Sequence, residues 1–177
     1  MTTIRALTQP TVIFETLLGR CAIRWSDAGI TGVRLPSTTS RGPSPVDPTA
    51  APAIVQNAIE GIRAVLAGES PDLRPIPLDD RAIDPFRRRV YAATREIRPG
   101  TTATYGQIAR AIGESGAARD VGAALARNPV PIIVPCHRIV AVNGALTGFS
   151  APGGLATKRR MLELEGAPGY GQQVLFG

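Results

Sequence analysis

The chain has 177 residues, 44% of them hydrophobic, which suits one sizeable domain or two small ones with a real apolar core. It has no run of eighteen apolar residues that could cross a membrane, and its first ten residues lack the pattern of a secretory signal, so we expect a cytoplasmic protein. Residues 1–85 hold eight Arg and nine acidic residues, whereas residues 86–177 hold eleven Arg, one Lys and five acidic residues; this balance suits contacts with phosphate, although a GC-rich genome would also produce it.

The first part of the chain predicts a small antiparallel sheet. Three β-branched or alternating runs, residues 12–16, 21–25 and 30–35, are separated by turn residues, which is typical of a meander of hairpins. Cys21 falls in the second run, where the ordinary interpretation of a free cysteine is a small buried hydrophobe.

The next segment predicts a loop, a helix and one more strand. Residues 36–52 are rich in Pro, Ser and Thr and predict a surface loop. Apolar residues then recur at helical spacing over residues 54–66 and stop near Gly68, which predicts a helix. Residues 73–78 predict an edge strand, because their two prolines would not suit a central one.

The second half predicts four short helices. Asp84-Pro85 begins the first, whose apolar positions continue to Ile97. Thr104 caps the second. The second, third and fourth helices are expected over residues 105–112, 117–127 and 155–165.

The second and third of these helices, joined by a tight glycine turn, predict a helix-turn-helix unit. Arg119 lies near the N-terminus of the helix that would read nucleic acid. Helix pairs with small residues are also frequent in proteins that never touch DNA. The basic composition of this half is therefore needed to support the interpretation.

The segment Pro135-Cys136-His137-Arg138 places one of two cysteines beside the only histidine of the chain. A thiolate is a strong nucleophile and needs a base, a cation or a dipole to form at neutral pH. Neighbouring side chains on extended backbone point to opposite sides, so we expect His137 to reach Cys136 through a bridging water and not directly.

Aliphatic residues flank this segment and predict a buried thiol. Because burial raises the pKa of a cysteine, deprotonation would need a relay whose third member orients the histidine, and Glu165 is the candidate. The competing interpretation is a buried Cys136 beside a surface His137 without chemistry. One histidine and two cysteines cannot build a usual zinc site, so we predict no metal and two free thiols.

Four sequence blocks stand in unbroken order over about residues 84–166. They are Tyr105-Gly-Gln-Ile-Ala, Ala118-Arg119-Asp-Val-Gly122, Asn128-Pro129-Val-Pro131-Ile-Ile-Val-Pro135-Cys136-His137-Arg138, and Leu146-Thr-Gly148-Phe149-Ser150 followed by Gly153-Gly154-Leu155. Together they resemble the O6-alkylguanine-DNA alkyltransferases. The Pro-Cys-His-Arg block with its upstream Asn-Pro is highly specific, whereas the helix-turn-helix alone is not.

The resemblance implies a DNA repair protein that transfers an alkyl group from O6-alkylguanine, and less readily from O4-alkylthymine, to its own cysteine in one irreversible turnover. Cys136 would be the acceptor, and no cofactor would be needed. His137 would take the thiol proton through a water while Glu165 holds the imidazole. Asn128 would brace the turn that carries the cysteine.

The resemblance also implies which residues handle DNA. Arg119 would enter the base stack in place of the extruded nucleotide and Tyr105 would donate a hydrogen bond to the flipped base, with Arg138 grouped beside them. The base pocket would be lined by Pro131, Phe149 and Ser150. The partner would be double-stranded DNA containing alkylated bases, bound in the minor groove by a monomer, with side-by-side binding on DNA left open.

Two positions depart from the family's pattern. Phe149 stands where tyrosine is frequent, and Ala151-Pro152 looks like a two-residue insertion in the pocket loop. Both put the acceptance of larger alkyl groups in doubt. The residues that bind zinc in the N-terminal domain of some relatives are absent.

We therefore expect an α+β protein with a structural N-terminal α/β domain over residues 1–83 and a C-terminal DNA-binding and alkyl-acceptor domain over residues 84–177. Two alternatives remain. A lesion-sensing DNA-binding protein without transfer would use Arg119 but would not depend on Cys136. A thiol hydrolase would use Cys136 and His137 but would leave the basic helix-turn-helix unexplained.

Overall fold

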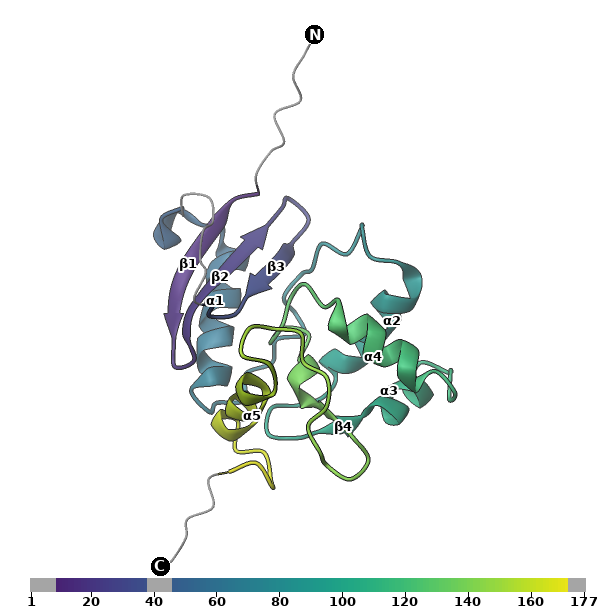
Figure 1. Cartoon of the computed structure of the whole chain (residues 1–177). Coiled ribbons are helices and arrows are strands. Elements are labelled where there is room, and N and C mark those ends of the chain that lie inside the picture. Colours follow the sequence, from purple (N-terminus) through teal and green to yellow (C-terminus); the bar gives the residue numbers. More distant parts are fainter. Residues whose placement is uncertain (1–8, 38–45, 172–177) are drawn as a thin grey trace, which may run out of the picture.

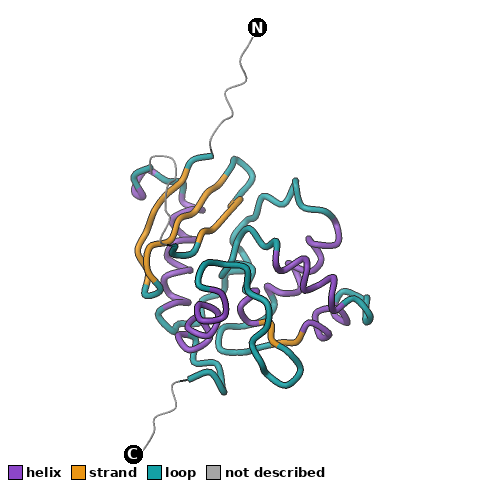
Figure 2. Tube along the Cα trace, in the orientation of Figure 1, coloured by secondary structure: helices purple, strands orange, loops and turns teal. Residues whose placement is uncertain are grey.

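The computed structural model describes residues 9–37 and 46–171. A three-stranded antiparallel sheet with one helix across it stands beside a cluster of short helices (Figure 1), and long loops connect the elements of the second part (Figure 2). The expected α+β class is confirmed. No helix within the described residues is long and apolar enough to cross a membrane.

The sheet follows the predicted meander. Its strands are β1 (Thr11–Thr16), β2 (Gly19–Trp25) and β3 (Ile30–Arg34), in the order β1-β2-β3. The β1–β2 hairpin closes at Gly19, whose φ of +121° is a conformation that favours glycine. Cys21 pairs with Phe14 and is 1% exposed, which confirms it as a buried residue of the second strand.

One helix, α1 (Ala53–Leu66), covers the inner face of the sheet. Its buried positions recur at the spacing of one helical face, as predicted, and Gly68 follows its end with a φ of +86°. They are Val55, Ala58, Ile59, Ile62, Val65 and Leu66. Each of the Val, Ile and Leu side chains contributes about 1.5 to 3 kcal/mol on burial, so this layer is a main source of stability.

The strand predicted over residues 73–78 is wrong, whereas the loop before α1 is in part outside the described residues. Residues 73–78 do not form a strand: only Leu78 pairs, in a single parallel bridge with Ile30, because Pro75 and Pro77 have no backbone N–H to donate. Of the expected loop 36–52, residues 38–45 lie outside the described residues, and the 3₁₀ turn η1 (Pro48–Ala50) precedes α1.

The four helices of the second half are present within a few residues of their predicted bounds. They are α2 (Pro85–Arg95), α3 (Tyr105–Ala111), α4 (Ala118–Ala126) and α5 (Gly154–Leu164). Asp84 caps α2, and Thr104 forms a capping box with Gln107 at the start of α3. A short parallel pair, β4 (Ala103–Thr104) and β5 (Ile139–Val140), was not predicted.

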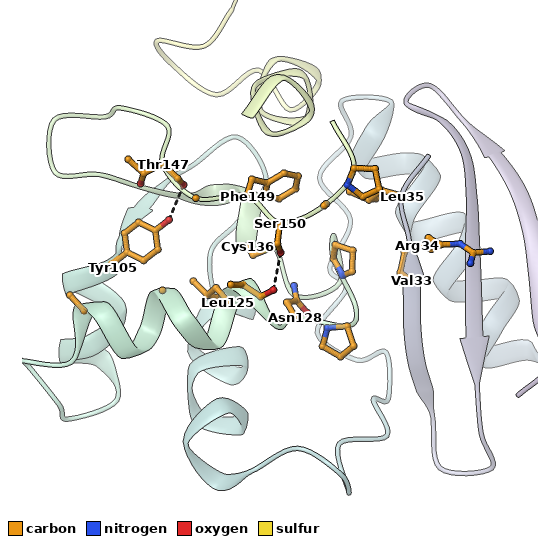
Figure 3. Close-up of a pocket in the computed structure, with 18 of the residues that line it drawn as sticks. Val33, Arg34, Leu35, Tyr105, Leu125, Asn128, Cys136, Thr147, Phe149 and Ser150 are labelled. Atoms are coloured by element: carbon orange, nitrogen blue, oxygen red, sulfur yellow. Dashed lines mark hydrogen bonds between the residues drawn. The ribbon is translucent and has the colours of Figure 1, made fainter. Parts of the chain in front are cut away.

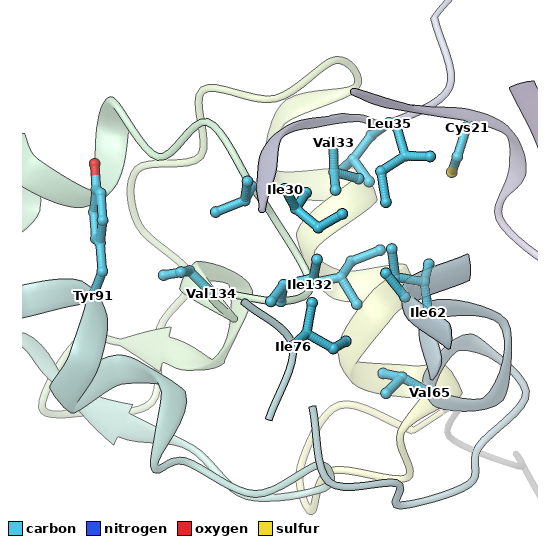
Figure 4. Close-up of a cluster of buried hydrophobic side chains, with 14 of the residues drawn as sticks. Cys21, Ile30, Val33, Leu35, Ile62, Val65, Ile76, Tyr91, Ile132 and Val134 are labelled. Carbon is cyan, nitrogen blue, oxygen red and sulfur yellow. The ribbon is translucent and has the colours of Figure 1, made fainter. Parts of the chain in front are cut away.

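The two halves share one apolar core. Ile132 and Val134, which precede Cys136, belong to the same buried cluster as Ile30 of the sheet and Ile62 of α1 (Figure 4). The outer edge of β3 also bonds to this segment, because the Val33 N–H donates to the Pro129 carbonyl at 2.9 Å. The sheet therefore helps to fix the loop that carries the cysteine. The division into domains 1–83 and 84–177 stays a prediction.

Candidate active site

A cavity of about 750 Å³ opens between the helical cluster and the sheet, with Cys136 in its wall (Figure 3). Helix α4, the segment 128–131, the loop 147–152 and residues 33–35 of the sheet side line it. The three pocket residues expected from sequence, Pro131, Phe149 and Ser150, are all among them. Ala151 and Pro152 line the cavity as well, so this pair shapes its interior, whereas its being an insertion stays a prediction.

The turn that carries Cys136 is held by Asn128. The Asn128 amide donates to the Val134 carbonyl at 2.8 Å, and its oxygen accepts from the Val130 N–H at 3.0 Å. Between them Ile132 has a φ of +75°, the only positive value of a non-glycine residue in the described part of the chain. A branched residue persists in that conformation only where its surroundings enforce it, so this loop is rigidly specified.

Cys136 begins a short 3₁₀ helix, η2 (Cys136–Arg138), and not the extended segment that we expected. The compact turn arises because the Asn128 bonds and the bond from the Cys136 N–H to the Val134 carbonyl, 2.8 Å long, fold the chain back. Cys136 as a residue is only partly buried, and it lines the cavity. Burial still raises its pKa, against the opposing effects of the Asn128 side chain and of Lys158.

His137 and Glu165 form a buried pair. The distance from His137 Nε2 to Glu165 Oε1 is 2.7 Å, and both side chains are 0% exposed. Burial alone would raise the pKa of Glu165, but His137 and Arg138 outweigh it and lower that pKa to about 2. Glu165 is therefore ionised and can only accept, so Nε2 carries the imidazole hydrogen.

The other imidazole nitrogen of His137 is left as a bare base. Burial is the main cause that lowers the pKa of His137, so the ring is neutral at neutral pH. Nδ1 is buried and has no hydrogen-bond partner among the described residues. Neither ring nitrogen bonds directly to Cys136. The bridging water between the two side chains stays a prediction.

Arg138 does not lie where a DNA contact requires it. The side chain is 4% exposed, and its Nε and Nη2 donate to Glu165 at 2.8 to 3.1 Å while Nη1 donates to the Ile97 carbonyl at 2.6 Å. The expected grouping of Arg138 with the DNA-contacting residues is therefore corrected. Its guanidinium makes its hydrogen bonds inside the protein, where it fixes the Glu165 carboxylate that orients His137.

The remaining predicted residues lie on the cavity wall and on its rim. Tyr105 donates from its hydroxyl to the Thr147 carbonyl at 3.0 Å, and Ser150 donates to the Ala126 carbonyl at 2.8 Å (Figure 3). Arg119 is exposed in the first turn of α4, next to the cavity residue Ala118. The structure thus separates an exposed arginine from the buried His137–Glu165 pair.

One residue of the site was missed by the sequence interpretation. Lys158 of α5 is fully buried and donates to the Thr147 carbonyl at 2.9 Å. A usable signal was present, because Lys158 shares one helical face with Met161, Leu162 and Glu165 at spacings of three, four and seven. Among the described residues, no three His, Cys, Asp or Glu side chains cluster as metal ligands.

Comparison with known proteins gives a consistent result. Residues 85–167 match the family profile "6-O-methylguanine DNA methyltransferase, DNA binding domain". The methylated-DNA–protein-cysteine methyltransferase of Mycobacterium tuberculosis is 40% identical over 162 residues, which are 92% of this chain and 95% of that protein. The crystal structure of M. tuberculosis OGT in complex with DNA has a TM-score of 0.73 at 37% identity and covers 90% of this chain and 96% of that one. The O6-methylguanine-DNA methyltransferase of Pyrococcus kodakaraensis has a TM-score of 0.68 at 26% identity, covering 89% and 99%.

Proposed function

The chain belongs to the methylated-DNA–protein-cysteine methyltransferase family and is a DNA repair enzyme that works by alkyl transfer, and from this premise we propose that Cys136 removes alkyl groups from O6-alkylguanine in double-stranded DNA. O4-alkylthymine would be a slower substrate. Each protein molecule would act once, because the thioether formed on Cys136 has no ordinary route of reversal.

The observation that carries this proposal is the arrangement around His137. Its Nε2 is fixed on Glu165 at 2.7 Å, whereas Nδ1 is a buried base without a partner among the described residues, directly after the cysteine in the chain. Such a base can take the thiol proton through one water. A standing thiolate is not required, which agrees with the raised pKa of the Cys136 thiol.

The proposed reaction needs no second reactant. The Cys136 sulfur attacks the alkyl carbon in line as the bond from that carbon to the base oxygen breaks, so one C–S bond replaces one C–O bond. The thiol proton passes to His137, whose new positive charge Glu165 stabilises. The departing base takes up one proton, returned from the His137 imidazolium through water, and leaves neutral. Tyr105 donates a hydrogen bond to the base while negative charge develops there.

The damaged base would reach Cys136 only after it leaves the stack. Arg119, exposed at the start of α4, would fill the gap, and the N-terminal turn of that helix would approach the backbone in the minor groove. Residues 84–177 would carry this DNA-binding and acceptor function, with residues 1–83 as a structural domain. The protein would bind DNA as a monomer.

Intact mass spectrometry tests the transfer. Wild-type protein incubated with duplex DNA that contains O6-methylguanine should gain the mass of one methyl group, and Cys136→Ser should gain none. Tight binding without any change in mass would instead indicate a lesion sensor. Turnover of a thioester or amide by Cys136 would indicate a hydrolase.

The Arg119 role has its own test. Arg119→Ala should slow methyl transfer from duplex DNA far more than transfer from the free alkylated base, because only the duplex requires extrusion. Equal losses on the two substrates would remove the flipping role. Arg110→Ala, in the preceding helix and also exposed, is the matched charge control.

A further inference from the structure

Arg24 belongs to the middle strand of the sheet, yet it lines the cavity that contains Cys136. Strand β3 lies between β2 and that cavity, because the Val33 N–H on the outer edge of β3 donates to Pro129 of the cavity wall. Arg24 therefore reaches the cavity with its side chain, across the whole width of a strand. Ordinary exposure on the face of a sheet does not account for that path.

The side chain of Arg24 runs over Gly32. The two residues are directly paired across β2 and β3, so their side-chain positions share one face of the sheet. A Cβ atom at Gly32 would lie 2.9 Å from Arg24 Nη2 and 3.2 Å from its Nε. Gly32 has no positive φ that would favour glycine, and a glycine inside a strand weakens it. The absence of a side chain at Gly32 leaves room for the guanidinium.

The Arg24 guanidinium has no partner within the part of the chain that the structure describes. No carboxylate forms an ion pair with it, and none of its nitrogens donates to a protein acceptor. Arg20, on the same strand and also exposed, is by contrast paired with Glu15 at 3.0 Å. Because a guanidinium has only hydrogen-bond donors, an unpaired one at a cavity is suited to an anionic ligand.

The other charges around this end of the cavity leave Arg24 as the best placed cation. Arg34 also lines the cavity and is exposed, but its side chain points away from Cys136 (Figure 3). No acidic residue in the described ranges lines the cavity. An anion at its edge would therefore meet a positive charge and no negative one.

A nucleotide extruded from DNA would supply such an anion. Its base would enter the largely apolar interior beside Cys136, whereas its phosphates carry charge and would stay at the edge in contact with water. Arg24 is exposed and lies at the edge of the cavity, where a phosphate would remain. A guanidinium can bind two oxygens of one phosphate at once.

We propose that Arg24 binds a phosphate of the damaged strand next to the extruded nucleotide, and that Gly32 keeps the path of its side chain open. The inference rests on the proposed extrusion of the alkylated base into the cavity of Cys136. It gives the N-terminal sheet a direct contact with DNA. The ligand is the sugar-phosphate backbone, so the contact carries no preference for a base sequence.

The salt dependence of DNA binding measures this contact. Binding is followed in the Cys136→Ser background, so that no transfer occurs, with duplex DNA that contains one O6-methylguanine. Arg24→Ala should weaken binding about tenfold at low salt and reduce the slope of log K against log salt by about 0.9, the value for one phosphate. Arg24→Lys keeps the charge and should keep the slope. Arg20→Ala, whose cation is paired with Glu15 and lies outside the cavity, is the matched control and should keep both.

Three outcomes would contradict the assignment. An unchanged slope in Arg24→Ala would overturn the contact with phosphate. An equal loss in Arg20→Ala would show that net charge alone is responsible. Undamaged duplex should lose less affinity than the damaged one, because its nucleotides stay stacked; an equal loss there would overturn the contact next to the extruded nucleotide.

Gly32→Val tests the path of the side chain with Arg24 still present. The valine side chain would occupy the space of the guanidinium, and a β-branched residue suits a strand. The variant should lose most of the affinity that Arg24→Ala loses, and the double variant should bind no more weakly than Arg24→Ala alone. Losses that add would overturn the role of Gly32. Urea denaturation checks the fold, and Arg24→Ala, which truncates an exposed side chain, tests the phosphate contact independently.

Methyl transfer separates this proposal from the proposed function. With Cys136 intact, Arg24→Ala should slow transfer from duplex DNA about ten times more than transfer from free O6-methylguanine base, because the free base has no phosphate. Equal losses on the two substrates would overturn the role of Arg24. If the wild-type protein accepts no methyl group from either substrate, the proposed function fails, and the salt slopes in the Cys136→Ser background still report the Arg24 contact.

Discussion

The sheet side and the cysteine side of the molecule bury different kinds of side chain. Between the sheet and α1 the core is aliphatic, with Val12, Ile23 and Ile62 all 0% exposed. Around η2 and α5 the buried set includes His137, Arg138, Lys158 and Glu165, and no other described residue with an ionisable acid or base is buried to this degree, apart from Cys21, Tyr91 and Tyr170. Apolar burial favours folding, whereas buried charge opposes it unless each group is paired. The comparison teaches that stability and chemistry are largely assigned to different regions.

The largest expected effect comes from breaking the buried ion cluster. Glu165→Gln leaves the Arg138 guanidinium buried without its counter-charge and should cost about 3 to 5 kcal/mol of unfolding free energy. Methyl transfer should fall with it, because His137 loses its orienting carboxylate. Urea denaturation measures the loss of unfolding free energy, and intact mass spectrometry measures methyl transfer. Glu163→Gln, on the same helix and only in a loose contact of 3.6 Å with Arg160, should change stability by less than about 0.5 kcal/mol; equal losses would contradict the assignment.

A truncation on the sheet side should be nearly as costly but chemically silent. Ile62→Ala removes a fully buried side chain from α1 and should cost about 2 to 5 kcal/mol. Under conditions where the variant is folded, the pH profile for alkylation of Cys136 by iodoacetamide should match wild type. A shifted profile would show that the two regions are coupled more closely than their composition suggests.

Acid should weaken the cysteine side selectively. The folded protein lowers the pKa of Glu165 from 4.5 to about 2, so this carboxylate contributes stability above pH 4.5 that is lost as pH falls toward 2. That change corresponds to about 3 kcal/mol. His137, whose pKa is also lowered, adds a loss of the same sign below about pH 6.5. Urea denaturation between pH 7 and pH 3 should show this slope in wild type and a weaker one in Glu165→Gln; identical slopes would remove Glu165 as the cause.

The smallest effect concerns the other cysteine. Burial raises the pKa of the Cys21 thiol to about 11, so iodoacetamide at neutral pH should label Cys136 and leave Cys21 free. Cys21→Ala should cost about 1 kcal/mol and leave methyl transfer unchanged. Peptide mapping after labelling shows which of the two cysteines is modified. Modification of Cys21 in the folded protein would contradict its buried position.

Local signals were sufficient for most of the fold. The strands alternate, Asp84 and Thr104 supply the side-chain oxygens that cap helices, and glycines stand at the turns, so these elements were predictable within a few residues. The segment 73–78 was not predictable in the same way. Its apolar content suggested a strand, but Pro75 and Pro77 have no N–H to donate, Arg74 and Ile76 donate within the loop, and only Leu78 pairs with the sheet.

The candidate site was predictable in part of its membership but not in its geometry. The sequence and the resemblance indicated Cys136, His137, Glu165 and Asn128, and the structure brings these four together, whereas Lys158 was missed. The 3₁₀ turn was missed because it depends on the contact of Asn128 with Val134, six residues away. Arg138 was misplaced for a related reason: an arginine next to a nucleophile suggests DNA, and only the fold reveals that Glu165, 27 residues later, occupies it.

The bond from the Val33 N–H to the Pro129 carbonyl has a consequence for solubility. An open strand edge is a template on which other chains can pair and aggregate. In this molecule the outer edge of β3 is occupied at one end by the Ile30–Leu78 bridge and at the other by the loop that leads to Cys136. Any change that displaces that loop also exposes unpaired backbone groups on the outer edge of β3. We therefore expect variants with a displaced acceptor loop to aggregate before the sheet itself unfolds.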